Sequence, residues 1–160
     1  MPKTVPPDVA SAPRYDRRVP DVTSRTFDDL STRELHDILR LRSDVFVVEQ
    51  AGVYSDVDGR DIEPDTSHHW IERDGTTAAY LRVLRDNDRT PKIGRVLTAP
   101  DARGDGLAAA LVRTVAAGID GPVVLDAQTH LAGWYERLGF TIDGPEFVED
   151  GIPHVPMRRP

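Results

Sequence analysis

The chain has 160 residues and a formal net charge of −7, with 39 % hydrophobic residues, 29 % charged residues and no cysteine. This length and composition fit a single globular domain with its own core, and the lack of cysteine excludes disulfides, thiolate metal sites and a cysteine nucleophile. The acidic balance argues against a general nucleic-acid-binding protein, which needs lysine and arginine to displace phosphate counterions. It would favour cationic small substrates, but an acidic surface is also a common way for a protein to stay soluble, and we prefer this simpler interpretation.

The N-terminal segment, residues 1–24, is rich in proline, serine and alternating charge and shows no hydrophobic periodicity. We therefore expect a flexible arm there and a folded domain over residues 25–160. The segment lacks the apolar run of a secretory signal, and the longest apolar run of the chain, LAAALV at 107–112, is too short to cross a bilayer. We expect a cytoplasmic protein that does not associate with membranes.

The first predicted element is a helix that begins after Ser31. Ser31 and Glu34 have the spacing of a capping box, and the apolar positions that follow have helical spacing, with a break expected near Ser43: Leu35, Ile38, Leu39, Val45 and Phe46. The acidic segment 51–66 comes next. It fails the calcium-loop pattern because Gly59 falls one place early and no glutamate occupies the twelfth position, so we expect a solvated loop that rims a pocket on the acceptor side.

Two strands are predicted at 67–73 and 76–86, joined by the tight-turn dipeptide Asp74-Gly75, and a third at 92–99. His68 and His69 are adjacent on the first of these strands. Their side chains must point to opposite faces, so they cannot bind one metal ion together, and we expect no metal site. Trp70 and Trp134 are interpreted as aromatic residues of the core or of a pocket wall.

The C-terminal half begins with a helix whose apolar stripe starts at Leu107 and which ends at Gly118 or Gly121. A buried strand at 122–127, a helix at 130–140 ended by Gly139, and two strands around a loop within 141–159 complete the chain. This order of elements predicts an α/β or α+β domain with a mixed sheet.

The segment 103–108, RGDGLA, joins the third strand to the second helix. Main-chain N–H groups at a helix start have no intrahelical partner and lie at the positive end of the helix dipole, so this turn can hold a diphosphate. The alternative is that Gly104 and Gly106 only allow the strand to turn into the helix. A dinucleotide fingerprint, Gly104-x-Gly106-x-x-Ala109, also fits, with Asp126 about twenty residues further on. Five residues separate the strand from its first glycine, however, and too little chain follows for a doubly wound sheet.

Four stretches in order resemble the GNAT superfamily of N-acetyltransferases. Arg103-x-x-Gly106-x-Ala108, after a strand ending in VLTAP, resembles its motif A. FVVEQ at 46–50, LDAQTHLAGWYERLGF at 125–140 and GPEFVEDGIPHVPM at 144–157 resemble the signatures of its ElaA-like branch. The resemblance covers about residues 26–158 and implies a single GNAT-type domain in which helices flank a mixed, mostly antiparallel central sheet.

The resemblance implies acetyl-coenzyme A as cosubstrate, without a metal. Its pyrophosphate would lie on the main-chain amides of Arg103, Gly104, Asp105, Gly106, Leu107 and Ala108, and its pantetheine arm would pair like a strand with the main chain at Leu97 and Thr98. Two positions depart from the family pattern. Asp105 stands where a basic residue is common, and Ala108 replaces the more frequent glycine.

Direct acyl transfer requires a neutral amine, a donor for the developing oxyanion and stabilisation of the leaving thiolate. The resemblance casts Tyr135 as the general acid toward the sulfur; without it, Tyr135 would be interpreted as a core residue. Glu49, after the apolar VFVV, is the first candidate base because it would be partly buried, and His154 is the second. Glu49 as a surface carboxylate and His154 as a structural histidine remain the alternatives.

We therefore expect an acetyl-coenzyme A-dependent N-acetyltransferase that acts on a primary amine of a small molecule or peptide, with no nucleic-acid partner. A non-catalytic acyl-coenzyme A-binding regulatory module is the alternative. The sequence leaves both a monomer and a homodimer open.

Overall fold

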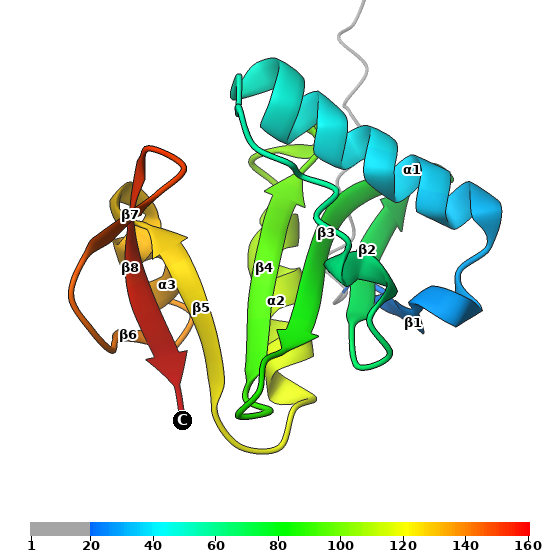
Figure 1. Cartoon of the computed structure of the whole chain (residues 1–160). Coiled ribbons are helices and arrows are strands. Elements are labelled where there is room, and N and C mark those ends of the chain that lie inside the picture. Colours follow the sequence, from blue (N-terminus) through cyan, green and yellow to red (C-terminus); the bar gives the residue numbers. More distant parts are fainter. Residues whose placement is uncertain (1–19) are drawn as a thin grey trace, which may run out of the picture.

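The computed structural model describes residues 20–160, which form one eight-stranded sheet with helices on its faces (Figure 1). Most of the predicted N-terminal arm lies outside the described residues, and Thr23 and Ser24 at its end belong to the first strand, β1 (Thr23–Thr26). This strand was not predicted. It lies at the edge of the sheet and is mostly exposed, so it carries no hydrophobic alternation.

The N-terminal half of the sheet is an antiparallel series: β1, β2 (Ser67–Arg73), β3 (Thr76–Arg85) and β4 (Pro91–Thr98). The predicted tight turn between β2 and β3 is confirmed, because Arg73 pairs with Thr76 and both Asp74 and Gly75 have positive φ. β3 is the most buried strand and passes through the centre of the core.

The C-terminal half adds β5 (Val123–Gln128), β6 (Thr141–Ile142), β7 (Phe147–Glu149) and β8 (Ile152–Arg159). β8 pairs with β5 on one side and with β6 and β7 on the other, all antiparallel. Only β4 and β5 pair in parallel, which makes the sheet mixed and mostly antiparallel, as expected. Three strands follow Gly139 instead of the two predicted, because the loop divides the first into β6 and β7.

Helix α1 (Thr32–Arg42) lies across one face of the sheet and α2 (Leu107–Ala117) lies on the opposite face (Figure 1). The predicted capping box is present at the start of α1: the Glu34 N–H donates to Ser31 Oγ at 3.2 Å, and the Ser31 N–H donates to the Glu34 carboxylate at 2.7 Å. The expected break near Ser43 is also present, since the chain continues as a π-helix over Ser43–Glu49. Helix α3 (Ala132–Glu136) is shorter than predicted and follows a 3₁₀ turn at Thr129–Leu131.

Candidate active site

The glycine turn before α2 has the conformation that its sequence predicts. Gly104 and Gly106 adopt φ of +88° and +74°, and a Cβ built at either position would meet no atom within 4 Å. The left-handed backbone alone is a sufficient reason for both glycines. The open space above them is free for a ligand, and the first turn of α2 directs unpaired main-chain N–H groups there. The side chains of Leu97 and Leu107 are buried in the core, so these two residues can offer only their main chain.

Two ion pairs flank this turn, and they involve its two charged residues, Asp105 and Arg103. Asp105, the acidic departure from the family pattern, accepts from Arg73 Nη1 at 2.6 Å. Arg103 contacts both carboxylate oxygens of Glu49, at 2.9 and 3.0 Å. The Asp105 carboxylate is therefore compensated by a neighbouring guanidinium, whereas Arg103 is engaged by a carboxylate that an incoming anion would have to displace.

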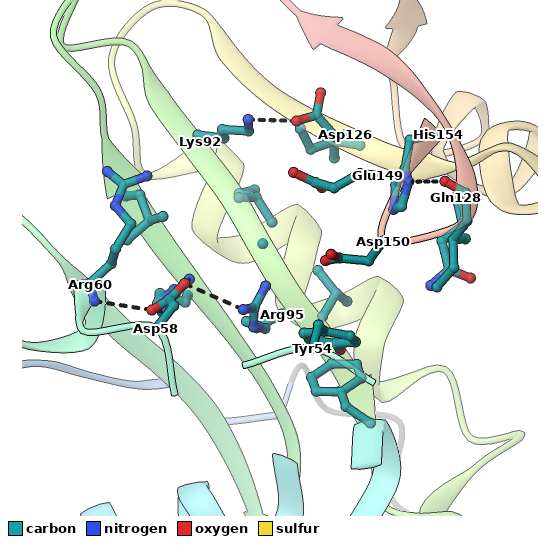
Figure 2. A pocket seen from close by; sticks show the side chains of 18 of the residues that line it. Tyr54, Asp58, Arg60, Lys92, Arg95, Asp126, Gln128, Glu149, Asp150 and His154 are labelled. Atoms are coloured by element: carbon teal, nitrogen blue, oxygen red, sulfur yellow. Dashed lines mark hydrogen bonds and ion pairs between the residues drawn. The ribbon is translucent and has the colours of Figure 1, made fainter. Parts of the chain in front are cut away.

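β4 and β5 pair only at Lys92–Val124 and Ile93–Leu125. Beyond Ile93 the partnership ends, and β4 carries a bulge at which Arg95 has φ of +54°. A cavity of about 530 Å³ opens where the two strands separate (Figure 2). Its walls come from β4, β5, α3, the 51–66 loop and the β7–β8 hairpin. This volume suits a small-molecule ligand.

Tyr135 of α3 lines the cavity. Its side chain is buried and packs edge-on against Trp134 and Phe140, with ring centroids 4.7 and 5.9 Å away. Burial raises the pKa of Tyr135 to about 12, because the phenolate would lose its hydration. The Tyr135 hydroxyl makes no hydrogen bond within residues 20–160, so it is free to donate to a ligand.

The two candidate bases occupy different places. His154 of β8 lines the cavity, and its Nδ1 lies 2.8 Å from the Ile152 carbonyl oxygen. A carbonyl can only accept, so Nδ1 carries the hydrogen and Nε2 is left with its lone pair in the neutral ring. Glu49, the first choice from the sequence, is exposed, bound to Arg103 and not part of the cavity wall. The partial burial on which its choice depended is absent.

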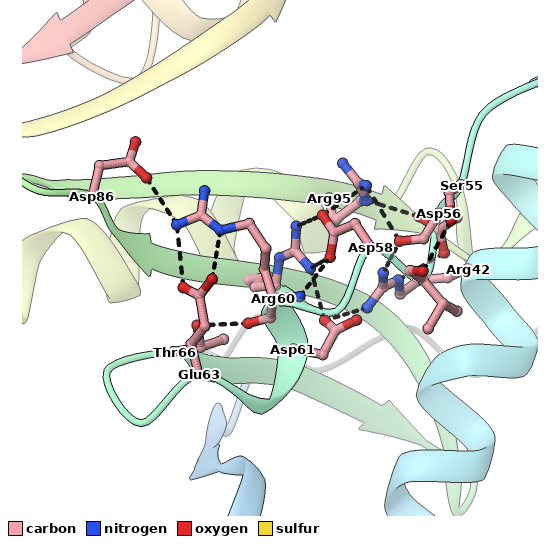
Figure 3. Close-up of polar contacts among 12 residues, drawn as sticks. Arg42, Ser55, Asp56, Asp58, Arg60, Asp61, Glu63, Thr66, Asp86 and Arg95 are labelled. Carbon is pink, nitrogen blue, oxygen red and sulfur yellow. Dashed lines mark hydrogen bonds and ion pairs between the residues drawn. The ribbon is translucent and has the colours of Figure 1, made fainter.

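The 51–66 loop rims the cavity with Tyr54, Ser55, Asp58 and Arg60, and most of its residues are exposed, but two of its carboxylates are not solvated as we expected. Asp56 and Asp61 are buried and bind the fully buried Arg42 of α1 at 2.9 and 2.7 Å (Figure 3). Asp56 and Asp61 are buried because three arginines, on α1, β3 and β4, converge on their carboxylates. They are Arg42, Arg82 and Arg95.

The arginines also set the charge state of the loop. Burial would raise the pKa of Asp58, but hydrogen bonds from Arg82 and from the Arg60 N–H hold it well below its usual range. Burial acts on Asp61 in the same direction, and Arg42 and Arg82 again overcome it, so its pKa is lowered too. Both carboxylates therefore stay ionised at neutral pH and keep the loop tied to the sheet.

Glu149 and Asp150 are among the residues of the cavity wall that were not predicted from the sequence. They stand at the tip of the β7–β8 hairpin, where Glu149 pairs with Ile152 and both Asp150 and Gly151 have positive φ. This is the two-residue hairpin turn that Asp-Gly favours. The Asp150-Gly151 dipeptide is the same signal that located the β2–β3 turn and would have placed this turn too.

His68 and His69 point to opposite faces of β2, as predicted. His68 is buried between the Tyr80 hydroxyl, at 2.7 Å, and the Asp61 carbonyl oxygen, at 3.0 Å. His69 contacts the hydroxyls of Ser24 and Ser67. Within residues 20–160 there is no group of three or more histidine, aspartate or glutamate side chains placed to hold a metal, and no helix in this part has the length and apolarity to span a membrane.

Comparison with known proteins agrees with this geometry. The profile of the acetyltransferase (GNAT) domain matches residues 40–159. UPF0039 protein Rv2851c of Mycobacterium tuberculosis is 44 % identical over 137 residues, which cover 82 % of this chain and 88 % of that protein. Protein ElaA of Escherichia coli is 38 % identical over 138 residues, covering 82 % of this chain and 90 % of ElaA.

Solved structures give the same result for the fold. The crystal structure of an acyl-CoA N-acyltransferase from Pseudomonas aeruginosa superposes with a TM-score of 0.82 at 41 % identity, covering 88 % of this chain and 99 % of that one. The crystal structure of Escherichia coli ElaA superposes with a TM-score of 0.81 at 33 % identity and the same coverage.

Proposed function

Because the chain belongs to the GNAT acetyltransferase family, in its ElaA-like branch, we propose that it transfers an acetyl group from acetyl-coenzyme A directly to a primary amine. The observation that carries this proposal is the cavity between the separated ends of β4 and β5, which has the unpaired hydroxyl of Tyr135 in its wall.

The glycine turn fits the diphosphate of the cosubstrate. The N–H groups of residues 103–108 would hold it, the side-chain-free surface of Gly104 and Gly106 would let it approach, and Arg103 would exchange Glu49 for a phosphate oxygen. Arg73 neutralises Asp105, which removes most of the repulsion expected from that position.

The free edge of β4 would hold the pantetheine arm. β4 and β5 do not pair beyond Ile93. From there to the end of β4 at Leu97 and Thr98, the main-chain groups of β4 that face β5 have no partner strand. An amide-bearing arm can pair there as an extra strand would. When bound, the cosubstrate supplies an acetyl thioester, which an amine attacks without a covalent enzyme intermediate.

Tyr135 would stabilise the departing thiolate. With a pKa of about 12 it keeps its proton at every physiological pH. A thiol is roughly a thousandfold stronger acid than such a phenol, so complete proton transfer to the sulfur is unfavourable. We therefore assign Tyr135 a hydrogen bond to the developing negative charge.

His154 would accept the proton of the amine. Its Nδ1–H is held by the Ile152 carbonyl, and its Nε2 lone pair is available in the cavity wall. Phe147 stacks on the imidazole ring, with centroids 5.8 Å apart, and restricts its orientation. This assignment reverses the order of the two candidates, because His154 lines the cavity and Glu49 does not.

The test combines binding and turnover. Acetyl-coenzyme A should bind the protein in calorimetry, and a panel of amines should include one that releases free thiol. Gly106→Val should reduce cosubstrate affinity at least about tenfold by filling the turn with a side chain. Gly121→Val is the matched control, because Gly121 has φ of +86° and equally open space but lies beyond the far end of α2.

The outcomes separate the alternatives. Equal affinity in the two folded variants would contradict the assigned cosubstrate site. Tight, turn-dependent binding without acetylation of any amine would favour the non-catalytic acyl-coenzyme A-binding module.

A further inference from the structure

The cavity wall contains four cationic side chains, and each is already paired with a carboxylate. Arg60 binds Glu63 and Asp86, Arg82 binds Asp58 and Asp61, Lys92 binds Asp126, and Arg95 binds Asp56 and Asp58. Five of these seven contacts are 2.7–2.9 Å long. An acceptor carboxylate would therefore find no uncommitted cation among the residues that line the cavity.

Two anionic side chains of the same wall are uncommitted. The carboxylates of Glu149 and Asp150 have no hydrogen bond or ion pair to any residue in the described part of the chain, and Figure 2 shows both directed into the cavity. Asp150 interacts only at longer range, through its field at Tyr54. The unpaired charges of the cavity wall are therefore both negative, and both stand on one hairpin tip.

The hairpin fixes these carboxylates relative to the proposed base. Glu149 pairs with Ile152 across the strands, and His154 pairs with Phe147. Because side chains alternate along a strand, Ile152 and His154 share one face, and both line the cavity together with Glu149. The two-residue turn at Asp150-Gly151 leaves the tip little freedom to turn away.

The reacting amine cannot be the group that these carboxylates recognise, since it must be neutral to attack the thioester. Two unpaired carboxylates beside it instead complement a second group of the acceptor, one that stays positively charged during the reaction. We propose that the acceptor is a diamine-type molecule, with a second cationic centre beside the acetylated amine and no carboxylate. This inference rests on the proposed acetyl transfer and specifies its substrate class.

A series of matched amines tests it: 1,5-diaminopentane, 1-aminopentane and 6-aminohexanoate, which carry a positive, no and a negative charge at the end of the same five-carbon spacer. We expect kcat/KM for the diamine to exceed that for the monoamine about tenfold or more, and the amino acid to be the poorest acceptor. The preference should shrink as the salt concentration rises, because the carboxylates are exposed.

The residues are tested with Glu149→Gln, Asp150→Asn and the double variant, all nearly isosteric. Asparagine tolerates the positive φ of residue 150. Each single change should lower the ratio of diamine to monoamine kcat/KM about threefold, and the double change about tenfold. Asp74→Asn is the control, since it removes one charge from the same kind of Asp-Gly turn in the β2–β3 hairpin and should leave the ratio unchanged.

Equilibrium binding of 1,5-diaminopentane to the protein saturated with coenzyme A separates this inference from the transfer proposal. Binding that weakens in the double variant supports the inference, and if no acetylation accompanies it, the transfer proposal alone fails. Equal turnover of diamine and monoamine, or a ratio indifferent to the double change, overturns the inference and leaves acetyl transfer standing.

Discussion

At the scale of single residues, two buried tyrosines carry hydroxyl groups with different surroundings. The Tyr80 hydroxyl lies 2.7 Å from His68 Nδ1 and is part of the core. The Tyr135 hydroxyl has no partner in residues 20–160 and belongs to a residue that lines the cavity. The Tyr135 hydroxyl is not one of the fully buried side-chain atoms that lack a partner in residues 20–160, so it keeps contact with the cavity and is accessible to a ligand.

Removing each hydroxyl should separate stability from turnover. Tyr135→Phe should lower kcat roughly a hundredfold, leave acetyl-coenzyme A affinity unchanged and hardly change the melting temperature. Tyr80→Phe should instead cost about 1 kcal/mol of stability and retain turnover. Thiol-release kinetics and thermal denaturation of both variants check this, and normal kcat in Tyr135→Phe would remove its assigned role.

At the scale of elements, ion pairs connect the 51–66 loop both to α1 and to the central strands. Arg42 reaches it from α1, and Arg82 and Arg95 reach it from β3 and β4. Arg95 stands at the bulge of β4 and lies over the Tyr54 ring, with its guanidinium carbon 5.5 Å from the ring centroid. The same contacts that anchor the loop therefore also hold the strand at the point where it separates from β5.

Removing the ion pairs of Arg42 should lower the free energy of unfolding substantially. Arg42 is fully buried, so Arg42→Met would leave Asp56 and Asp61 short of a partner in a site from which water is excluded. We expect a loss of about 3–5 kcal/mol in the free energy of unfolding. Arg40→Met removes an exposed arginine from the same helix and should change it by less than about 0.5 kcal/mol. Urea denaturation distinguishes the two, and equal midpoints would contradict a structural role for the network.

At the scale of the whole molecule, buried groups that fold in their neutral form limit stability at both ends of the pH range. Desolvation lowers the pKa of His69 from 6.5 to about 4, and it also lowers the pKa of His68. As the pH falls below about 6.5, these histidines become protonated in the unfolded chain but stay neutral in the folded chain, so the free energy of unfolding decreases toward pH 4. Desolvation raises the pKa of Tyr135 to about 12 and that of Tyr80 still further. Above about pH 10 the unfolded chain loses protons first, and stability decreases again.

We therefore expect the melting temperature to be highest between about pH 7 and 10. His69→Gln keeps a group that can bond to the neighbouring serine hydroxyls but does not titrate, so it should flatten the decrease between pH 6.5 and 4. Melting curves across pH 4–11 provide the measurement. A melting temperature that is constant from pH 7 to 4.5 in the unmodified protein would contradict this account.

The sequence by itself determined the features that depend on residues a few positions apart. Ser31 and Glu34 cap a helix through contacts across one turn, Asp74-Gly75 closes a hairpin, and the positive φ of Gly104 and Gly106 is available to few other residues. Together with the family signatures, these local signals were enough to predict the order of most elements and a mixed, mostly antiparallel sheet.

Only the tertiary structure decided which charges meet and which stay free. Arg95 and Asp56 are 39 positions apart in the chain yet only 2.7 Å apart in space, and their contact helps to bury Asp56 within an acidic loop whose other residues are mostly exposed. Arg103, 54 positions away in the chain, binds Glu49 outside the cavity wall, while the pairing of β7 with β8 places Glu149 and Asp150 in that wall. Whether a charged side chain is buried, paired or available depends on the partners that distant segments supply, and local sequence does not encode those distances.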